Sequence, residues 1–400
     1  MIACPPALSR RRSTTISGGA RRRAPVLLGM LALLSQPALA LDLAEAERIA
    51  IERDAMLRQL AAESEAMRER GVMEGQLMDP KLRLGAVNVP VDSWSLDAED
   101  MTMLELGVSQ EFPAGRTRKL ARKRMDQSAA ASDAMAADRQ LTVQREVRRV
   151  WTELAYLARA RELVQGQASW VEQMRGSARA RYASGEGKQL DVLLAGLDVA
   201  MLREQLLDLD RDEAMRRAQL GRWIGEDEAR LAHPTALPAR SSLEPLATLE
   251  QRLGSHPAQQ DYEHRIDAAN TAVELAEQRK RPSWMLDLSY GFRSGEMSDG
   301  ETRPDMATAM VTFDLPLFPG KRQDREVAAA RAEARGLHDM HDDHQREMRA
   351  MLAEAWSIAE RTAELERLYE SELVPLAEQS VQAALLALRS NRVMVDEVIT

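Results

Sequence analysis

The feature that most constrains the fold of this chain is an internal duplication. Matching residues occur in order along the sequence, at a spacing that drifts only from 202 to 205 residues: Pro80 with Pro282, Val108 with Val311, Glu111 with Asp314, Pro113 with Pro316, Gly115 with Gly320, Trp151 with Trp356, Gly185 with Ser390, and Asp191 with Asp396. One such match arises by chance, but an ordered series over most of a chain does not. The sequence therefore predicts two copies of one structural unit.

Each unit is expected to run from a helix through two short strands into a long helix. We assign the first repeat to residues 41–230, a linker to 231–243 and the second repeat to 244–400. The predicted strands lie near 80–90 and 101–112, followed by a helical hairpin at 115–225, and near 282–293 and 305–316, followed by a helix at 321–388. Pro80 and Pro282 end the preceding helices, predicted at 43–78 and 244–280, because proline lacks a backbone N–H and clashes with the preceding turn. The expected fold class is mostly α with a small β part.

The predicted strands alternate between apolar and polar residues, so each has one apolar face. In the strand at 282–293, the apolar residues that we expect to face lipid are Trp284, Leu286, Leu288, Tyr290 and Phe292. Strands of this length and pattern are typical of a transmembrane β-barrel with an aqueous lumen. Two amphipathic hairpins lying on a soluble core are the alternative. Because four strands cannot close a barrel, the membrane interpretation requires several copies of the chain.

The rest of the chain is predicted to form long helices. Only 4% of the residues are aromatic while 29% are charged, which favours extended helices over a large compact core. A coiled-coil seam is predicted after the first strand pair at Val143, Val147, Val150, Leu154, Leu157 and Val164. The next helix has two apolar stripes, one at Leu190, Leu194, Leu197 and Met201 and one at Val192, Val199, Leu206 and Leu209. This helix is therefore expected to pack on two sides.

The first 40 residues are predicted to be a Sec-type signal peptide. Six arginines and no acidic residue lie within residues 1–23, an apolar run follows at 24–34, and Ala38-Leu39-Ala40 provides a cleavage site. Removing these six positive charges would take the net charge from −9 to −15 and would also remove Cys4, the single cysteine. The mature chain is expected to be an exported acidic protein that is not anchored through a lipidated cysteine. Nucleic acid is not an expected partner of such a chain.

In these respects the chain resembles the TolC family of trimeric outer-membrane efflux ducts, and in particular its heavy-metal and cation branch. The resemblance extends from about Leu41 to Thr400. It rests on the duplicated corners after the strand pairs, Phe112-Pro113-Ala114-Gly115 and Leu317-Phe318-Pro319-Gly320. It rests also on two stretches similar to the hairpin tips of the family, 181–192 and 390–396.

The resemblance implies that each protomer gives four strands to a trimeric, twelve-stranded outer-membrane β-barrel, and that its long helices form a periplasmic α-barrel. The tips would contact a periplasmic adaptor protein and an inner-membrane pump of the resistance–nodulation–division (RND) type. The matching tip residues are Gly185, Gly187, Asp191, Ser390, Arg392 and Asp396. The implied location is the outer membrane, with a large periplasmic portion, and no cofactor is implied.

The chain also departs from the pattern of the family. Ser390 stands where glycine is usual, and Ile399 stands where some members carry a gating carboxylate, so we assign no gating residue. Only four residues follow Asp396, whereas about 35 residues of predicted helix follow Asp191. The final hairpin is therefore expected to be truncated here, and the functional product is expected to continue past Thr400.

One cluster has the character of metal ligands, namely His338, His341 and His344, spaced by three residues on a predicted helix. A solvated helix face is the preferred interpretation, since the equivalent stretch of the first repeat, 133–139, contains no histidine. The basic residues from Arg116 to Arg124 fit either contact with anionic lipid head groups or a solvated face. Because the sequence contains no nucleophile elbow, phosphate loop or zinc-protease signature, an enzyme is not expected.

The function predicted from the sequence is that of an outer-membrane channel subunit of a tripartite efflux system. It would be a passive export duct for cations, heavy metals or other small toxic compounds. The alternative is a periplasmic coiled-coil adaptor or scaffold protein without a barrel. A metal-buffering periplasmic protein is a third interpretation.

Overall fold

The computed structural model describes residues 41–232, 234 and 242–389, and every statement below refers to these residues. The predicted signal peptide, most of the predicted linker and the predicted second tip, with Ser390, Arg392 and Asp396, lie outside them. The described chain is mostly helical and contains one four-stranded sheet. Among its helices, none combines the length and hydropathy needed to cross a lipid bilayer.

Each repeat begins with two helices rather than with the single helix predicted from the sequence. These are α1 (Leu43–Arg53) and α2 (Ala55–Glu74) in the first repeat, and α6 (Leu246–Leu253) and α7 (Pro257–Gln278) in the second. The prediction of unbroken helices was wrong for local reasons. Asp54 adopts an extended backbone, and its carboxylate accepts a hydrogen bond from the backbone N–H of Leu57 at the start of α2. Pro257 opens α7 at a position where its missing N–H costs nothing.

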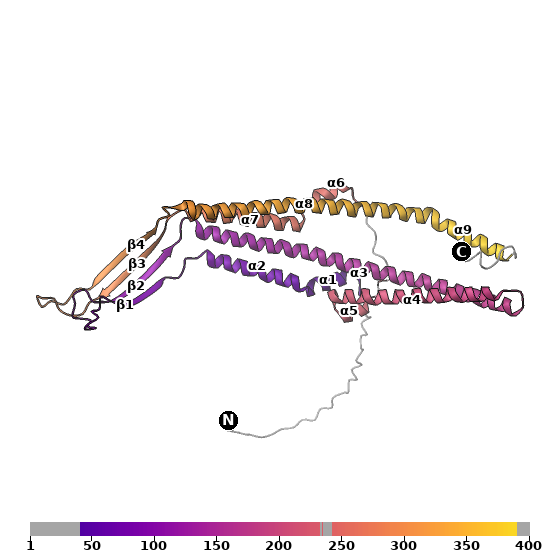
Figure 1. Ribbon diagram of the computed structural model, residues 1–400, viewed down its shortest axis with the longest axis horizontal. Coiled ribbons are helices and arrows are strands. Elements are labelled where there is room, and N and C mark those ends of the chain that lie inside the picture. The colour runs from indigo at the N-terminus through magenta and orange to yellow at the C-terminus, as the bar shows by residue number, and fades with distance from the viewer. Residues whose placement is uncertain (1–40, 233, 235–241, 390–400) are drawn as a thin grey trace, which may run out of the picture. The chain divides into compact units, whose positions relative to one another are not determined.

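The four strands form a single antiparallel sheet in the order β1-β2-β3-β4 (Figure 1). They are β1 (Lys81–Val87), β2 (Met103–Phe112), β3 (Ser283–Phe292) and β4 (Met306–Asp314), and all lie inside the ranges expected from the sequence. Each repeat supplies one hairpin, and the two hairpins join where β2 pairs with β3. The sheet therefore has two edges, β1 and β4.

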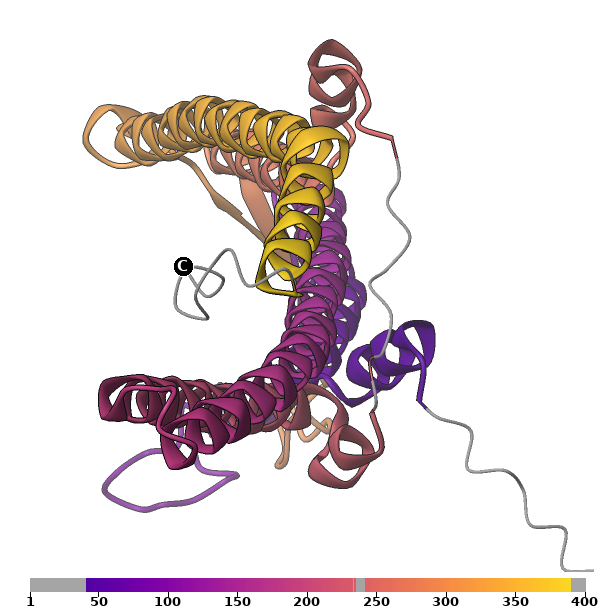
Figure 2. The same ribbon diagram turned by 90° about the vertical axis from the view of Figure 1, so that its right-hand side faces the viewer.

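Long helices follow each hairpin. In the first repeat these are α3 (Thr117–Ala183), α4 (Gln189–Ile224) and the short α5 (Glu226–Leu231). In the second, the 3-10 turn η1 (Pro319–Lys321) leads into α8 (Gln323–Leu368), a π-helical turn η2 (Tyr369–Leu373) and α9 (Val374–Arg389). Helices α3 and α4 lie side by side as a hairpin (Figure 2). Helix α3 also packs against α2 and α7, and α7 packs in turn against α8.

The main apolar core lies where α1, α3, α4 and α5 meet. The predicted seam is buried there, with Val143, Val147 and Val150 completely inaccessible to solvent and Trp151 only 5% exposed. The two stripes of α4 differ. Val199, Leu206 and Leu209 pack towards α3, whereas the stripe of Leu190, Leu194, Leu197 and Met201 is exposed. One of the two predicted contact sides of α4 therefore has no partner within the described chain.

A buried ion pair fixes α2 against α3. The Asp54 carboxylate, whose side chain is 5% exposed, accepts hydrogen bonds from Arg139 at 2.8 and 3.3 Å. Burial alone would raise the pKa of Asp54, but Arg139 and the Leu57 N–H more than offset it, so the pKa lies below the ordinary aspartate value. The ionised carboxylate is thus part of the folded state.

This pair predicts a pH-dependent effect of Asp54→Asn. Asparagine keeps the helix cap but loses the charge, so at pH 7 the variant should be less stable by about 1 kcal/mol. A lowered folded-state pKa gives stability that is present above the unfolded value of about 3.9 and is lost as the pH falls through the folded value. The difference in stability between wild type and variant, measured by thermal unfolding from pH 7 downwards, should shrink below about pH 4. A difference independent of pH would contradict the assignment.

Candidate functional site: an amphipathic sheet and a helical tip

One face of the sheet is apolar across all four strands. Directly paired residues in an antiparallel sheet share a face, and the pairing places apolar side chains in transverse rows. The rows are Ala86–Leu104–Phe292, Leu84–Leu106–Tyr290–Ala307, Leu82–Val108–Leu288–Ala309 and Phe112–Trp284–Phe313, with Gln110 as the polar exception in the row Gln110–Leu286–Val311. The apolar residues that alternate along each strand therefore form one continuous apolar surface across the sheet.

This apolar face has no covering layer within the described chain. Leu82 and Leu84 are 65% and 73% exposed, and of the predicted lipid-facing set, Trp284, Leu288, Tyr290 and Phe292 are exposed while Leu286 is half-buried. Every residue of β4 is exposed. Large contiguous apolar patches on isolated proteins are rare and mark interaction with lipid or with another protein. The exposed apolar face therefore marks the sheet as a surface that contacts lipid or another protein.

Aromatic residues lie at both ends of the apolar face. Phe112 stacks on Trp284, with ring centroids 4.0 Å apart, at one end, and Tyr290 and Phe292 lie at the other. Eight residues separate Trp284 from Phe292, about 26 Å along a strand, or about 20 Å after a 40° tilt. Aromatic girdles that flank an apolar band about 25 Å tall are typical of outer-membrane barrels.

The opposite face of the sheet is polar and carries an ion-pair network. The guanidinium of Arg83 on β1 lies 2.6 Å from Glu105 on β2 and 3.0 Å from Asp287 on β3. The two carboxylates are 16% and 14% exposed. Because one cation joins three adjacent strands, Arg83 also links the two repeats across the β2–β3 junction.

The loops between the strand partners are held together by an arginine that the sequence analysis missed. Arg303, in the loop between β3 and β4, is almost buried and donates hydrogen bonds to the carbonyl oxygens of Asp97 and Glu99 in the loop between β1 and β2. It also pairs with the Asp100 carboxylate at 2.9 Å. The sequence shows one loop that contains Arg303 and another that is acidic, but it does not show that the two interact.

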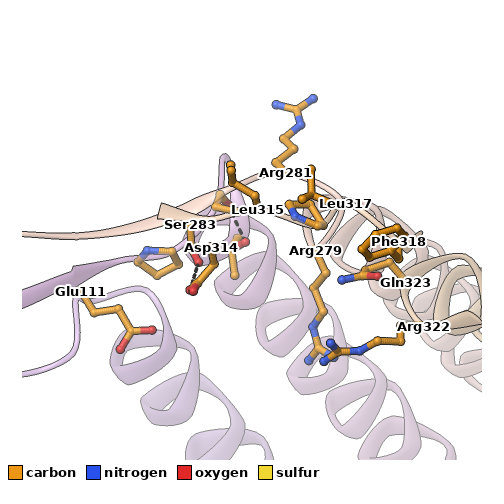
Figure 3. A pocket seen from close by; sticks show the side chains of 14 residues that line it. Glu111, Arg279, Arg281, Ser283, Asp314, Leu315, Leu317, Phe318, Arg322 and Gln323 are labelled. Atoms are coloured by element: carbon orange, nitrogen blue, oxygen red, sulfur yellow. Dashed lines mark hydrogen bonds between the residues drawn. The ribbon is translucent and has the colours of Figure 1, made fainter. Parts of the chain in front are cut away.

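A cavity of about 670 Å³ lies where the sheet meets the helices (Figure 3). Residues of both Pro/Gly corners line it, with Arg279 and Arg322 extending to the same side and Arg281 pointing away. Asp314 at the end of β4 accepts a hydrogen bond from Ser283 at 2.7 Å.

Of the basic residues predicted after the first corner, Arg116, Arg122 and Arg124 each lie within 4 Å of a neighbouring carboxylate.

The tip between α3 and α4 is a tight turn whose residues have structural roles. Gly185 has φ +78°, and a Cβ on Gly187 would lie 3.0 Å from the backbone nitrogen of Tyr182. The Asp191 carboxylate accepts a hydrogen bond from the backbone N–H of Lys188 at 3.3 Å, which caps its own helix. These contacts give the tip a defined shape, with Tyr182 49% exposed beside it.

The three histidines lie along α8 without converging on one point. His341 and His344 pack towards the ring of Tyr262, with centroids 5.9 and 4.9 Å away, while His338 is exposed. Gln345 lies 3.2 Å from His341 Nε2. In the described part of the chain, no group of three or more His, Cys, Asp or Glu side chains is placed to hold a metal ion.

No family model and no curated protein sequence matches this chain. Its fold is nevertheless similar to those of solved outer-membrane proteins. The outer-membrane protein VceC from Vibrio cholerae gives a TM-score of 0.72 at 17% identity, over 89% of this chain and 88% of that chain. A membrane protein from Pseudomonas aeruginosa gives 0.72 at 19% identity, over 96% and 92%. CusC gives 0.65 at 16% identity, over 89% and 84%.

These similarities confirm the expected fold of the single chain, which is mostly helical with a small antiparallel sheet. They do not single out the heavy-metal and cation branch of the TolC family. Membership of that branch stays a prediction.

The ion-pair network on the polar face predicts a compensation between variants. Arg83→Met leaves Glu105 and Asp287 without their shared cation and should lower the thermal unfolding temperature slightly, since the arginine is half exposed. Arg83→Met combined with Glu105→Gln removes the repulsion and should recover most of the loss. Thermal unfolding of the detergent-solubilised protein measures both. Equal losses in the single and double variants would show that the charges are not coupled.

Proposed function

We propose that this chain is a channel subunit of the outer membrane that acts as a passive export duct in a tripartite efflux system. The proposal rests on one observation above the others, which is a sheet with an uncovered apolar face, aromatic ends and a polar opposite face. In a bilayer this surface is stable only as part of a closed barrel, because unpaired backbone groups are costly in hydrocarbon.

A single chain cannot close such a barrel. Its four strands leave the edges β1 and β4 unpaired, and barrels need about eight strands or more. Three copies would supply twelve strands, as the resemblance to the TolC family implies. The polar face, with Arg83, Glu105 and Asp287, would then line an aqueous lumen.

The helices support the same assembly outside the membrane. Helix α4 packs on α3 with one apolar stripe and leaves the stripe of Leu190, Leu194, Leu197 and Met201 exposed. A neighbouring helix in a ring would cover such a seam. We propose that the helices form the periplasmic portion of the duct.

The tip is the proposed docking point for a periplasmic adaptor and an RND pump. Gly185, Gly187 and Asp191 define its shape in the first repeat, and Ser390, Arg392 and Asp396 are the proposed equivalents outside the described residues. The proposed cargo is cations, heavy metals or other small toxic compounds, and the net charge of −15 expected after removal of the signal peptide favours cations. The alternative function, a coiled-coil adaptor without a barrel, does not account for the amphipathic sheet.

The proposal predicts opposite outcomes for an arginine placed on the two faces of the sheet. Leu288→Arg puts a charge in the middle of the apolar face and should cost about 2–4 kcal/mol of membrane stability. Thr308→Arg puts the same charge on the polar face, where water would solvate it. Cell fractionation should find the wild type and Thr308→Arg as heat-modifiable oligomers in the outer membrane and should find Leu288→Arg depleted there.

The wild type reconstituted in planar bilayers should also give discrete conductance steps. Recovery of the wild type as a soluble periplasmic monomer would reject the channel in favour of the adaptor. Equal behaviour of the two arginine variants would reject the assignment of the faces.

A further inference from the structure

Methionine is distributed unevenly over the two faces of the sheet. The four described strands contain four methionines, namely Met103 on β2, Met285 on β3, and Met306 and Met310 on β4. The register places all four on the polar face, together with the ion-pair network of Arg83. The apolar face of the same strands consists of Leu, Val, Ala and aromatic residues with one glutamine. The methionines therefore lie on the face that the proposed channel turns towards water.

The sulfur atom distinguishes these side chains from other apolar ones. Within the four strands, Val87 is the one other large aliphatic residue on the polar face. A surface that binds apolar molecules would be expected to use leucine and aromatic residues too, as the opposite face does. Methionine differs from leucine of similar volume by its thioether, which is polarisable and is a soft metal ligand. The segregation therefore indicates a role for sulfur on this face.

Two of the methionines approach one glycine from opposite sides. A Cβ built on Gly291 of β3 would collide with the Sδ atom of Met103, so this sulfur lies directly over the glycine. Met306 on β4 pairs with Gly291 and is 38% exposed. Because Gly291 has no side chain, nothing from β3 separates the two thioethers at this level. Met103 and Met306 are thus neighbours across β3.

The other two methionines form a second pair nearer to the helices. Met285 pairs with Thr312 and Met310 pairs with Asp287, so the two methionines are diagonal neighbours on β3 and β4. Diagonal neighbours have Cβ atoms about 7–8 Å apart or somewhat less, which is within reach of long side chains. Met285 lies six residues before Gly291, about 20 Å along the strand. The polar face therefore carries two separate thioether pairs.

The carboxylates that could hold a hard cation on this face are mostly engaged. Glu105 and Asp287 contact Arg83 at 2.6 and 3.0 Å, and Asp314 accepts a hydrogen bond from Ser283 at 2.7 Å. Hard divalent cations prefer oxygen ligands, whereas soft monovalent cations such as Cu(I) prefer sulfur. The ligands that this face leaves available therefore favour a soft cation.

We propose that the two methionine pairs are binding sites for a soft monovalent cation, of the Cu(I) and Ag(I) class, on the wall of the barrel lumen. Each pair offers two neutral sulfur ligands, fewer than the closed four-ligand sites that hold structural metal ions. Such binding suits a duct, because an ion must bind well enough to enter and weakly enough to leave. The inference rests on the proposed channel, which makes this face the wall of a lumen, and adds binding residues to it.

Methionine-to-leucine variants test the sites, because leucine has a similar volume but no sulfur. The variants of the full-length protein are Met103→Leu/Met306→Leu, Met285→Leu/Met310→Leu and the quadruple combination. The matched control is Met73→Leu/Met351→Leu, which removes two thioethers that are 65% and 52% exposed on α2 and α8. Heat-modifiable migration of each variant in the outer membrane checks that it still assembles.

The probe is Ag⁺ in nitrate buffer, since Ag⁺ is soft and stable to oxidation. In detergent, competition with a chelator should show that each strand double variant loses binding of one Ag⁺ per chain, whereas the control binds as the wild type does. In planar bilayers, Ag⁺ should block the K⁺ current of the wild type. Loss of mere supporting contacts to a metal ligand costs about tenfold in affinity, so the quadruple variant should need at least about tenfold more Ag⁺ for half block.

The outcomes separate these sites from the channel itself. Equal Ag⁺ binding and equal block in the wild type and the quadruple variant, with normal K⁺ conductance, would overturn the sites and leave the channel standing. A quadruple variant that keeps its Ag⁺ binding but loses block by a neutral aromatic compound would show an apolar wall instead. A wild type without conductance would overturn the channel, and the Ag⁺ titration in detergent would then decide the sites alone.

Discussion

The structure depends on a constraint that one chain cannot satisfy, which is the burial of an apolar sheet face and the pairing of two strand edges. Leu82, Leu84 and Phe292 are more than half exposed, and β1 and β4 each have one unpaired side. Exposing such a surface to water is unfavourable, and placing it in the hydrocarbon of a bilayer requires that every backbone N–H and C=O group is hydrogen-bonded. The proposed closed barrel of several chains in a membrane would meet both requirements.

The duplication supplies both hairpins of the sheet from one chain. Two contacts join the repeats within the chain: Gln278 accepts a hydrogen bond from the backbone N–H of Arg116 at the first corner, and Arg83 pairs with Asp287. In the proposed channel, further copies of the chain would pair with the free edges β1 and β4 and close the sheet into a ring.

Local patterns made much of this fold predictable from the sequence. Strict alternation and flanking prolines placed all four strands, and the spacing of Val143, Val147 and Val150 identified a seam that is buried in the structure. The helix breaks at Asp54 and Pro257 were missed, because the periodicity of apolar residues does not show where a helix ends and a new one begins within a helical segment. Gln278 and Arg303 were missed because their partners lie far away in sequence. The predicted second tip lies outside the described residues.

The most direct test of the central claim is a cysteine accessibility scan along β3 in outer-membrane vesicles, using a water-soluble maleimide. Successive single cysteines at positions 285 to 290 alternate between the two faces of the strand. The account predicts labelling at 285, 287 and 289, which face the lumen, and protection at 286, 288 and 290, which face lipid. Uniform labelling along the strand, or the opposite alternation, would contradict it.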